Sequence, residues 1–191
     1  MTKTLLATLI LATAGVAAHA ELATYAIDPT HTFVTFEANH MGTSTLRGRF
    51  DKKEGMVTID KVAKTGKAEI TIDTSSISTG VAPLDTHLKS KDFFNATEFS
   101  TAKFVGDQFS FSGDKVTAVT GTLTMLGKTQ PVTLKATNYN CYINPMIKRE
   151  VCGGDFETTI ARSAYGMSFG IADYGLPDNI RLLVQVEAIK Q

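Results

Sequence analysis

The sequence predicts an all-β fold with one short helix. Most of the chain alternates apolar and polar residues with a period of two, and turn sequences such as Gly113-Asp114 and Gly127-Lys128 separate the alternating runs. Only the segment from about 84 to 95 has helical spacing. With so few helices to make parallel crossovers, consecutive strands are expected to pair antiparallel. About eight or more such strands curl into a sandwich or close into a barrel, since closure removes exposed edges.

The first twenty residues have the pattern of a signal peptide. Lys3 supplies a positive start, residues 5–18 form an apolar run too short to span a bilayer, and Ala18-His19-Ala20 resembles a small-x-small cleavage site. We therefore expect residues 1–20 to be removed and residues 21–191 to form a single domain. No later stretch approaches the roughly 20 apolar residues of a membrane helix, so stable membrane insertion is not expected.

The expected strands follow one another along the whole of residues 25–190. They cover 25–41 with an interruption at 28–30, then 46–50, 56–60, 68–73, 99–105, 108–111, 115–125, 131–140, 154–163 and 180–190. In the second of these strands Thr32, Val34 and Phe36 share one face, and Phe33 and Thr35 lie on the other.

The helical segment is expected to lie across the sheet or to plug it. Asp85 is placed to accept hydrogen bonds from free N–H groups of the first turn, and Pro83 favours a helix start. The segment offers Leu88, Phe93 and Phe94 as apolar side chains.

Three stretches of the chain resemble the YceI-like family of lipid-binding proteins. These are 87–94, with the wording His-Leu-x-Ser-x-Asp-Phe-Phe and followed by Phe99 and 101–104; the hairpin 121–134; and the opening 25–36. The resemblance extends over about 25 to 170. It implies an extended antiparallel barrel of about eight strands, lipocalin-like in shape, with the helix near one opening. It also suggests a bacterial exported protein, which is expected in the periplasm.

The segment 141–152 departs from the family because it contains the two cysteines of the chain. In an exported protein Cys141 and Cys152 are expected to form a disulfide that closes the base of a loop. A metal pair and a redox thiol are the alternatives, but no Cys-x-x-Cys spacing supports either.

Signatures of catalysis and of metal binding find little support. The stretch 121–129 ends Gly-Lys-Thr like a phosphate loop, but its glycines are spaced wrongly and a strand follows. His31, His40 and His87 show no ligand spacing, so metal binding is not expected. His31 and His40 are interpreted as histidines near strand ends that bond to backbone. His87 is placed in the first turn of the helix, with contact to a ligand headgroup as its alternative role.

The charged residues give no indication of a nucleic-acid partner. Lys and Arg number 19 and Asp and Glu number 19, so the formal net charge is zero. A local basic cluster of Arg47, Arg49, Lys52 and Lys53 is interpreted as a solvated strand face, with steering of an anionic headgroup or membrane surface as the alternative.

The aromatic residues carry the functional prediction. The chain has eleven phenylalanines and no tryptophan, and a closed barrel of about eight strands can hold one slender ligand if its walls are apolar. The candidate ligand-binding residues are Phe33, Phe36, Phe50, Leu88, Phe94, Phe99, Phe104 and Phe169, with His87 and Arg162 near the head of the ligand. Ordinary core packing is the alternative for each ring.

The resemblance implies a protein that carries or sequesters an isoprenoid lipid, such as a polyprenyl chain or an isoprenoid quinone. We expect no cofactor and no enzymatic activity, and a homodimer is possible. Two other functions stay open: an enzyme acting on a small amphiphile, and a stress-response or partner-binding module in which the cavity is incidental.

Overall fold

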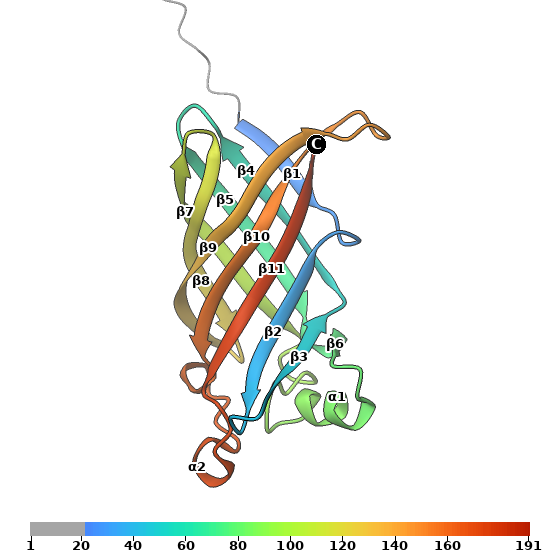
Figure 1. The fold of residues 1–191 in the computed structure, drawn as a ribbon, viewed down its shortest axis with the longest axis vertical. Coiled ribbons are helices and arrows are strands. Elements are labelled where there is room, and N and C mark those ends of the chain that lie inside the picture. The colour runs from blue at the N-terminus through green and yellow to red at the C-terminus, as the bar shows by residue number, and fades with distance from the viewer. Residues whose placement is uncertain (1–21) are drawn as a thin grey trace, which may run out of the picture.

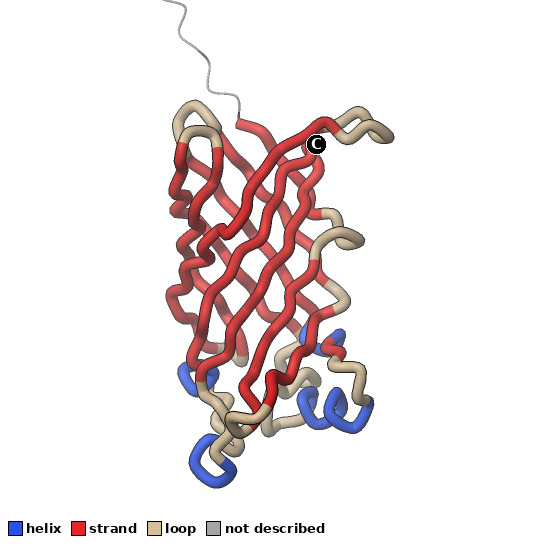
Figure 2. The backbone as a smooth tube through the Cα atoms, viewed as in Figure 1, coloured by secondary structure: helices blue, strands red, loops and turns tan. Residues whose placement is uncertain are grey.

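The chain folds into a long antiparallel barrel with short helical segments gathered at one end (Figures 1 and 2). The structure is a computed structural model and describes residues 22–191, so the predicted signal peptide 1–20 lies outside the described residues. The strands are β1 Leu22–Ile27, β2 Phe33–His40, β3 Ser44–Phe50, β4 Lys53–Asp60, β5 Thr65–Asp73, β6 Ile77–Ser78, β7 Thr101–Ser112, β8 Lys115–Met125, β9 Lys128–Ile143, β10 Glu150–Ala161 and β11 Asn179–Lys190. The helices are α1 Ala82–Lys89 and α2 Ile171–Tyr174, and the 3-10 turns are η1 Thr74–Ser76 and η2 Arg162–Tyr165.

Eight strands close the barrel in the order β1-β4-β5-β7-β8-β9-β10-β11. Strand β1 pairs antiparallel with β4 on one side and with β11 on the other, which completes the ring. Every pairing between neighbours is antiparallel, so no exposed edge is left along this part of the wall. The predicted barrel of about eight strands is therefore confirmed, and the sandwich is excluded.

Three further strands extend the wall at the end where the helices lie. Strand β11 pairs with β1 only through Ala188–Lys190, and its residues 181–185 pair with β2 instead. Strand β2 then pairs with β3, and β3 with the two-residue β6. Helix α1 follows β6 directly, so this lower end in Figure 1 is bordered by β2, β3, β6 and α1.

The apolar residues of the alternating pattern are the residues that are buried in the strands. Thr32, Val34 and Phe36 are all at most 8 % exposed and point into the barrel. Gly48 lies opposite Phe36 on β3, and a Cβ atom there would come within 2.3 Å of the Phe36 ring. The glycine therefore gives the aromatic ring the space it occupies inside the barrel.

The helix is shorter than predicted. Helix α1 ends at Lys89, and residues 90–100 continue as successive turns in which Asn95 has a positive φ of 41°. Asp85 does not cap the helix, because α1 begins at Ala82 with Val81 as its N-cap residue. Its Oδ1 instead accepts hydrogen bonds from the N–H and the hydroxyl of Thr79, both at 2.7 Å. Pro83 lies in the first turn, as predicted.

Two expected strands are in fact one, several others begin earlier than predicted, and the two-residue β6 was not predicted. Strand β7 runs without a break where the sequence predicted strands at 99–105 and 108–111, with a shift of register between Gly106 and Gln108 that marks a bulge. Strand β10 begins at Glu150 rather than at 154, because it pairs with β9 up to the turn. Within the described residues no helix is long and apolar enough to cross a membrane.

Candidate functional site

Two apolar cavities lie along the inside of the barrel. The lower cavity, at the end near α1, has a volume of about 360 Å³, and the upper cavity has a volume of about 100 Å³. Val34 lines both of them, so they adjoin at the middle of the barrel. The lower cavity by itself falls within the usual size range of ligand sites in proteins, which are mostly apolar with few polar groups.

Packed aromatic rings form much of the lower wall. The ring centroids of Phe36 and Phe50 lie 6.2 Å apart, and those of Phe50 and Phe94 lie 5.4 Å apart in an edge-to-face arrangement. These three rings come from β2, β3 and the turns after α1, and each such pair contributes about 1 kcal/mol beyond its buried area. The aromatic contacts therefore hold the segment 90–100 against the barrel at the side of the cavity.

A second group of rings joins α1 to the loop that follows β10. The His87 ring lies edge-on to Phe93 and Phe169, with centroids 5.0 and 5.2 Å apart, and the Phe93 and Phe169 centroids are 5.4 Å apart. Tyr174 on α2 extends the group, its centroid 5.9 Å from that of Phe169. All of these rings except that of Tyr174 line the lower cavity.

His87 supplies a polar group beside the cavity. Its Nε2 lies 2.9 Å from Oδ2 of Asp92, and both side chains are between 40 and 50 % exposed. The Nε2 edge of His87 therefore lies in solvent and is hydrogen-bonded to the Asp92 carboxylate. The rest of the ring contacts phenylalanines.

Arg162 lines the same cavity and is almost fully buried, with an exposed fraction of 4 %. Its guanidinium donates hydrogen bonds to the carbonyl oxygens of Pro177, Met167 and Phe169 at 2.7, 2.9 and 2.9 Å. Burial lowers the pKa of Arg162, and the nearby Asp178 carboxylate opposes that shift. A guanidinium has five N–H groups, so two remain after these three bonds.

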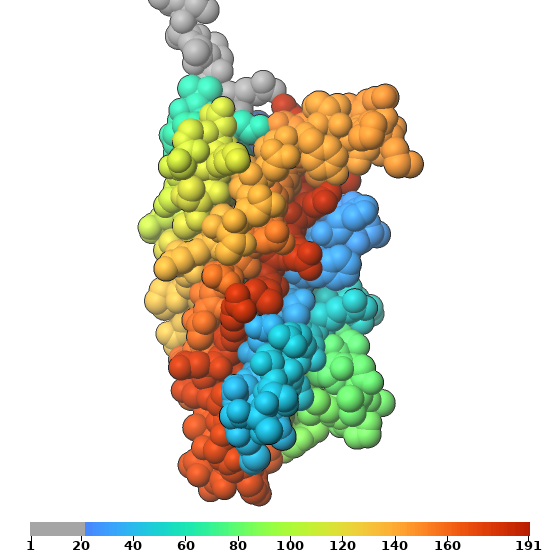
Figure 3. Space-filling model, in the orientation of Figure 1, coloured from blue at the N-terminus to red at the C-terminus, as the bar shows by residue number. Residues whose placement is uncertain are grey.

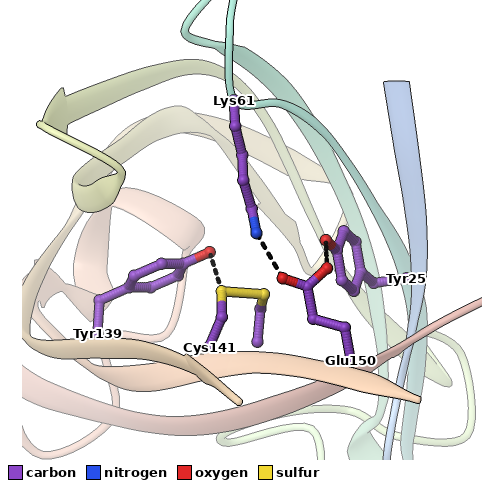
Figure 4. The surroundings of a disulfide bond; sticks show 6 residues. Tyr25, Lys61, Tyr139, Cys141 and Glu150 are labelled. Atoms are coloured by element: carbon purple, nitrogen blue, oxygen red, sulfur yellow. Dashed lines mark hydrogen bonds and ion pairs between the residues drawn. A yellow bond between two sulfur atoms is a disulfide. The ribbon is translucent and has the colours of Figure 1, made fainter. Parts of the chain in front are cut away.

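A polar network lies beside the disulfide at the upper end of the barrel (Figure 4). Glu150 accepts hydrogen bonds from the Tyr25 hydroxyl at 2.9 Å and from Lys61 Nζ at 2.6 Å. Burial raises the pKa of Glu150, but the bonds from Lys61 and Tyr25 outweigh it and hold that pKa below its usual value. Tyr139 lines the upper cavity nearby, and burial together with the Glu150 charge raises its pKa to about 12.

The predicted disulfide is confirmed. Cys141 on β9 and Cys152 on β10 are directly opposite each other, with Cα atoms 4.1 Å apart, and their sulfurs are bonded. Together with Glu150 they are the one group of His, Cys, Asp or Glu side chains in residues 22–191 close enough to hold a metal. Their thiols are used by the disulfide, and His31, His40 and His87 do not converge with them.

Most of the ligand-binding residues proposed from the sequence line a cavity. Phe36, Phe50, His87, Leu88, Phe94, Arg162 and Phe169 border the lower cavity, and Phe104 borders the upper one.

Two of the proposed wall residues lie elsewhere, which corrects their assignment. Phe33 is on the outer face of β2, where Lys53 Nζ and the Arg49 guanidinium lie 5.0 and 5.8 Å from its ring centroid. Phe99 packs near Gly127, a turn glycine with a φ of 71°.

Several wall residues that are not phenylalanine were not predicted from the sequence. Val34 joins the two cavities, Tyr25 and Tyr139 border the upper one, and Met167 and Leu182 border the lower one. The sequence does indicate Val34, since it shares its strand face with Phe36. It was missed because the wall residues were chosen mainly among phenylalanines, which leaves out aliphatic side chains.

An eight-stranded barrel with an apolar interior, one mouth bordered by a helix and few polar groups belongs to the class of ligand-binding barrels. The chain itself belongs to the YceI-like domain family, whose model matches residues 25–188.

Relatives and solved structures agree with this membership. The chain is 34 % identical over 195 residues to UPF0312 proteins of Pseudomonas aeruginosa and Shewanella denitrificans, covering 100 % of each chain. The crystal structure of Burkholderia cenocepacia BcnA is similar with a TM-score of 0.70 and 25 % identity, over 84 % of this chain and 98 % of that one. A polyisoprenoid binding domain from Saccharophagus degradans matches with a TM-score of 0.63 and 17 % identity, over 90 % and 100 % of the two chains, and shows the same fold.

Proposed function

We propose that the protein binds one isoprenoid lipid inside the barrel and carries or sequesters it in the periplasm. The observation that carries this proposal is the pair of adjoining apolar cavities, of about 360 and 100 Å³, in line along the barrel. A long cavity with apolar walls is complementary to a slender hydrocarbon chain. The Saccharophagus degradans domain of the same fold is a polyisoprenoid binding domain, which supports the same ligand class here.

The energetics favour a linear chain over a compact polar molecule. Each CH₂ group transferred from water to an apolar interior contributes about 0.8 kcal/mol, so a chain of several isoprene units gains much of its affinity without polar contacts. The narrow upper cavity takes the far end of such a chain. The wider lower cavity has space for the part of the ligand nearest its head.

The head of the ligand is expected beside His87 and Arg162. These are polar side chains among the phenylalanines of the lower cavity, and Arg162 still has two N–H groups to donate. Such donors suit the oxygens of a quinone ring or of a phosphate. A phosphate is anionic and a quinone ring is neutral. Binding of a phosphate head is therefore expected to depend more strongly on Arg162 than binding of a quinone head.

The proposed location depends on the sequence and on the disulfide. The pattern of residues 1–20 is that of a signal peptide, and disulfides persist in oxidising compartments such as the periplasm. Cell fractionation of a tagged full-length chain tests this location, and recovery of the uncleaved chain in the cytoplasm would contradict it.

The experiment for ligand binding is extraction of lipid from protein purified from its native host, followed by mass spectrometry. We expect one isoprenoid lipid per protein. Protein that carries none, and that gains none when incubated with a polyprenyl lipid, would point to an interaction module with an incidental cavity. Turnover of an added lipid ester or amide that is lost in His87→Ala would instead point to an enzyme.

A further inference from the structure

We propose that the hairpin of residues 142–149, which connects β9 to β10, is a docking site for an anionic lipid bilayer. Figure 3 shows this hairpin, in orange, standing out from the upper end of the barrel. It lies between the two cysteines of the disulfide, and none of its residues lines either cavity. The hairpin lies on the outer surface at the end opposite to α1, so docking there is separate from ligand binding inside the barrel.

The tip of the hairpin exposes large apolar side chains. Met146 is 88 % exposed, Ile143 is 64 % exposed and Ile147 is 45 % exposed. Isolated apolar residues on a surface are ordinary, but three within five positions on a projecting tip form a patch that is expected to be covered by something.

The same hairpin carries two basic side chains. Lys148 and Arg149 are exposed, and neither side chain forms an ion pair within the described part of the chain. The adjacent Glu150 is directed to Tyr25 and Lys61 at the barrel end. An apolar tip with basic residues beside it matches the apolar boundary and the anionic headgroups of a bilayer.

The hairpin is held in shape before it meets any partner. Asn144 Oδ1 accepts hydrogen bonds from the N–H groups of Met146 and Ile147 at 2.9 and 3.3 Å. The Asn144 N–H donates to the Arg149 carbonyl, and the Lys148 N–H donates to the Asn144 carbonyl, each at 2.9 Å. The disulfide Cys141–Cys152 closes the base. Little conformational entropy is therefore left to lose when the tip inserts.

A bilayer fits this surface better than a protein partner does. The tip is narrow and convex, whereas a stable protein interface buries about 800 Å² on each partner. Strand β1 starts at the same end of the barrel (Figure 1), and its first residue Leu22 is 62 % exposed. The loop after β4 reaches this end as well, and there Val62 is 66 % exposed. Additional apolar contacts thus lie at the same end as the hairpin.

The test measures binding of the purified protein to vesicles by co-sedimentation. The protein is first checked by mass spectrometry to lack residues 5–18, because that apolar run would itself enter lipid. Vesicles of phosphatidylglycerol and phosphatidylethanolamine are compared with vesicles of phosphatidylcholine alone. We expect binding to the anionic vesicles that weakens as salt is added, and little binding to the neutral ones.

Two variants of the hairpin test the contribution of its apolar tip and that of its basic residues separately. Met146→Glu is expected to weaken binding to the anionic vesicles at least about tenfold, since it removes an apolar side chain from lipid. The double variant Lys148→Gln, Arg149→Gln is expected to weaken it about 25-fold, about fivefold for each basic residue near an anionic surface. Neither variant is expected to change retention of an isoprenoid lipid, which separates this proposal from the function of the cavity.

The matched controls come from the other end of the molecule. Met41, in the turn after β2, is 59 % exposed, and Lys91 follows α1. Met41→Glu and Lys91→Gln are expected to bind anionic vesicles like the wild type. Equal loss in the controls and the hairpin variants would overturn the proposal, as would a wild type that sediments with neither vesicle. Binding of the hairpin to a purified protein but not to lipid would also overturn it.

Discussion

The rings of His87 and Phe169 meet edge to face, with centroids 5.2 Å apart, although strands β7 to β10 separate the two residues in the chain. His87 belongs to α1 and Phe169 to the loop after η2. Their contact brings together the two segments that border the lower cavity. A ligand entering between them would have to displace these rings or pass beside them.

Replacing Phe94 by aspartate is expected to lower lipid retention at least about tenfold. Phe94 lines the lower cavity and packs edge-on against Phe50, so the substitution puts an unpaired carboxylate among apolar groups. The measurement is the amount of lipid extracted per protein. Phe33→Asp is the matched control, because Phe33 is on the outer face beside Lys53 and Arg49, where a carboxylate is tolerated. Equal retention by the two variants would contradict the wall assignment.

Arg162 is expected to be needed for stability whether or not a ligand is bound. In Arg162→Met the carbonyls of Pro177, Met167 and Phe169 lose their donor, and each unsatisfied buried group costs about 1–3 kcal/mol. We expect urea denaturation to show a loss of about 3 kcal/mol or more. Arg47→Ala, which removes an exposed ion pair with Glu37, is expected to change stability little. A fully stable Arg162→Met would show that the loop of residues 162–178 does not depend on the guanidinium.

Removing the disulfide is expected to destabilise the protein only under oxidising conditions. Cys141 and Cys152 are 11 positions apart, and closing a loop of this size contributes about 3 kcal/mol in the chain-entropy model. Cys141→Ser should therefore unfold at lower urea than the wild type without reductant, and at the same urea as the wild type with reductant. A difference that persists in the reduced proteins would mean that the serine disturbs the barrel end in some other way.

The pair Asp28–His31 is expected to make stability depend on pH. Burial raises the pKa of Asp28, but hydrogen bonds from His31 and Thr30 outweigh it and lower that pKa to about 2, while the bond to Asp28 raises the pKa of His31. The contribution of Asp28 is present above about pH 4 and lost as pH falls towards 2. That of His31 is complete below about pH 6.5 and lost as pH rises through its folded pKa.

The variant His31→Gln tests this window. The wild type should exceed the variant in stability by more at about pH 5 than at about pH 8, as measured by urea denaturation. In NMR titration the His31 ring should titrate above the usual histidine range and return towards it in Asp28→Asn. A difference in stability that is the same at both pH values would contradict the ion pair.

Period-two alternation predicts the strands because successive residues of a strand point alternately into the barrel and out of it. It also places Phe33 on the strand face that does not carry Val34 and Phe36, so the outward position of Phe33 could be predicted from its neighbours alone. The closure of β1 on β11 could not, since a pairing between the two ends of the chain leaves no local signal. The family resemblance supplied that part.

The details of the helical end were beyond the sequence for a related reason. The sequence predicts Asp85 as a cap, but the helix begins at Ala82, so Asp85 lies inside the first turn. There it accepts hydrogen bonds from Thr79, the residue that follows β6. Arg162 and the carbonyls of Pro177, Met167 and Phe169 are joined by a loop whose path no periodicity describes. Contacts between irregular segments depend on the closed barrel, so they follow from the fold and not from local pattern.

The most direct measurement is a crystal structure of the protein with its co-purified lipid. We expect continuous density for one chain that passes Val34 from the lower cavity into the upper one, with its head beside His87 and Arg162. A lipid bound outside the barrel, or side chains filling both cavities in a protein that had been supplied with an isoprenoid, would contradict the account.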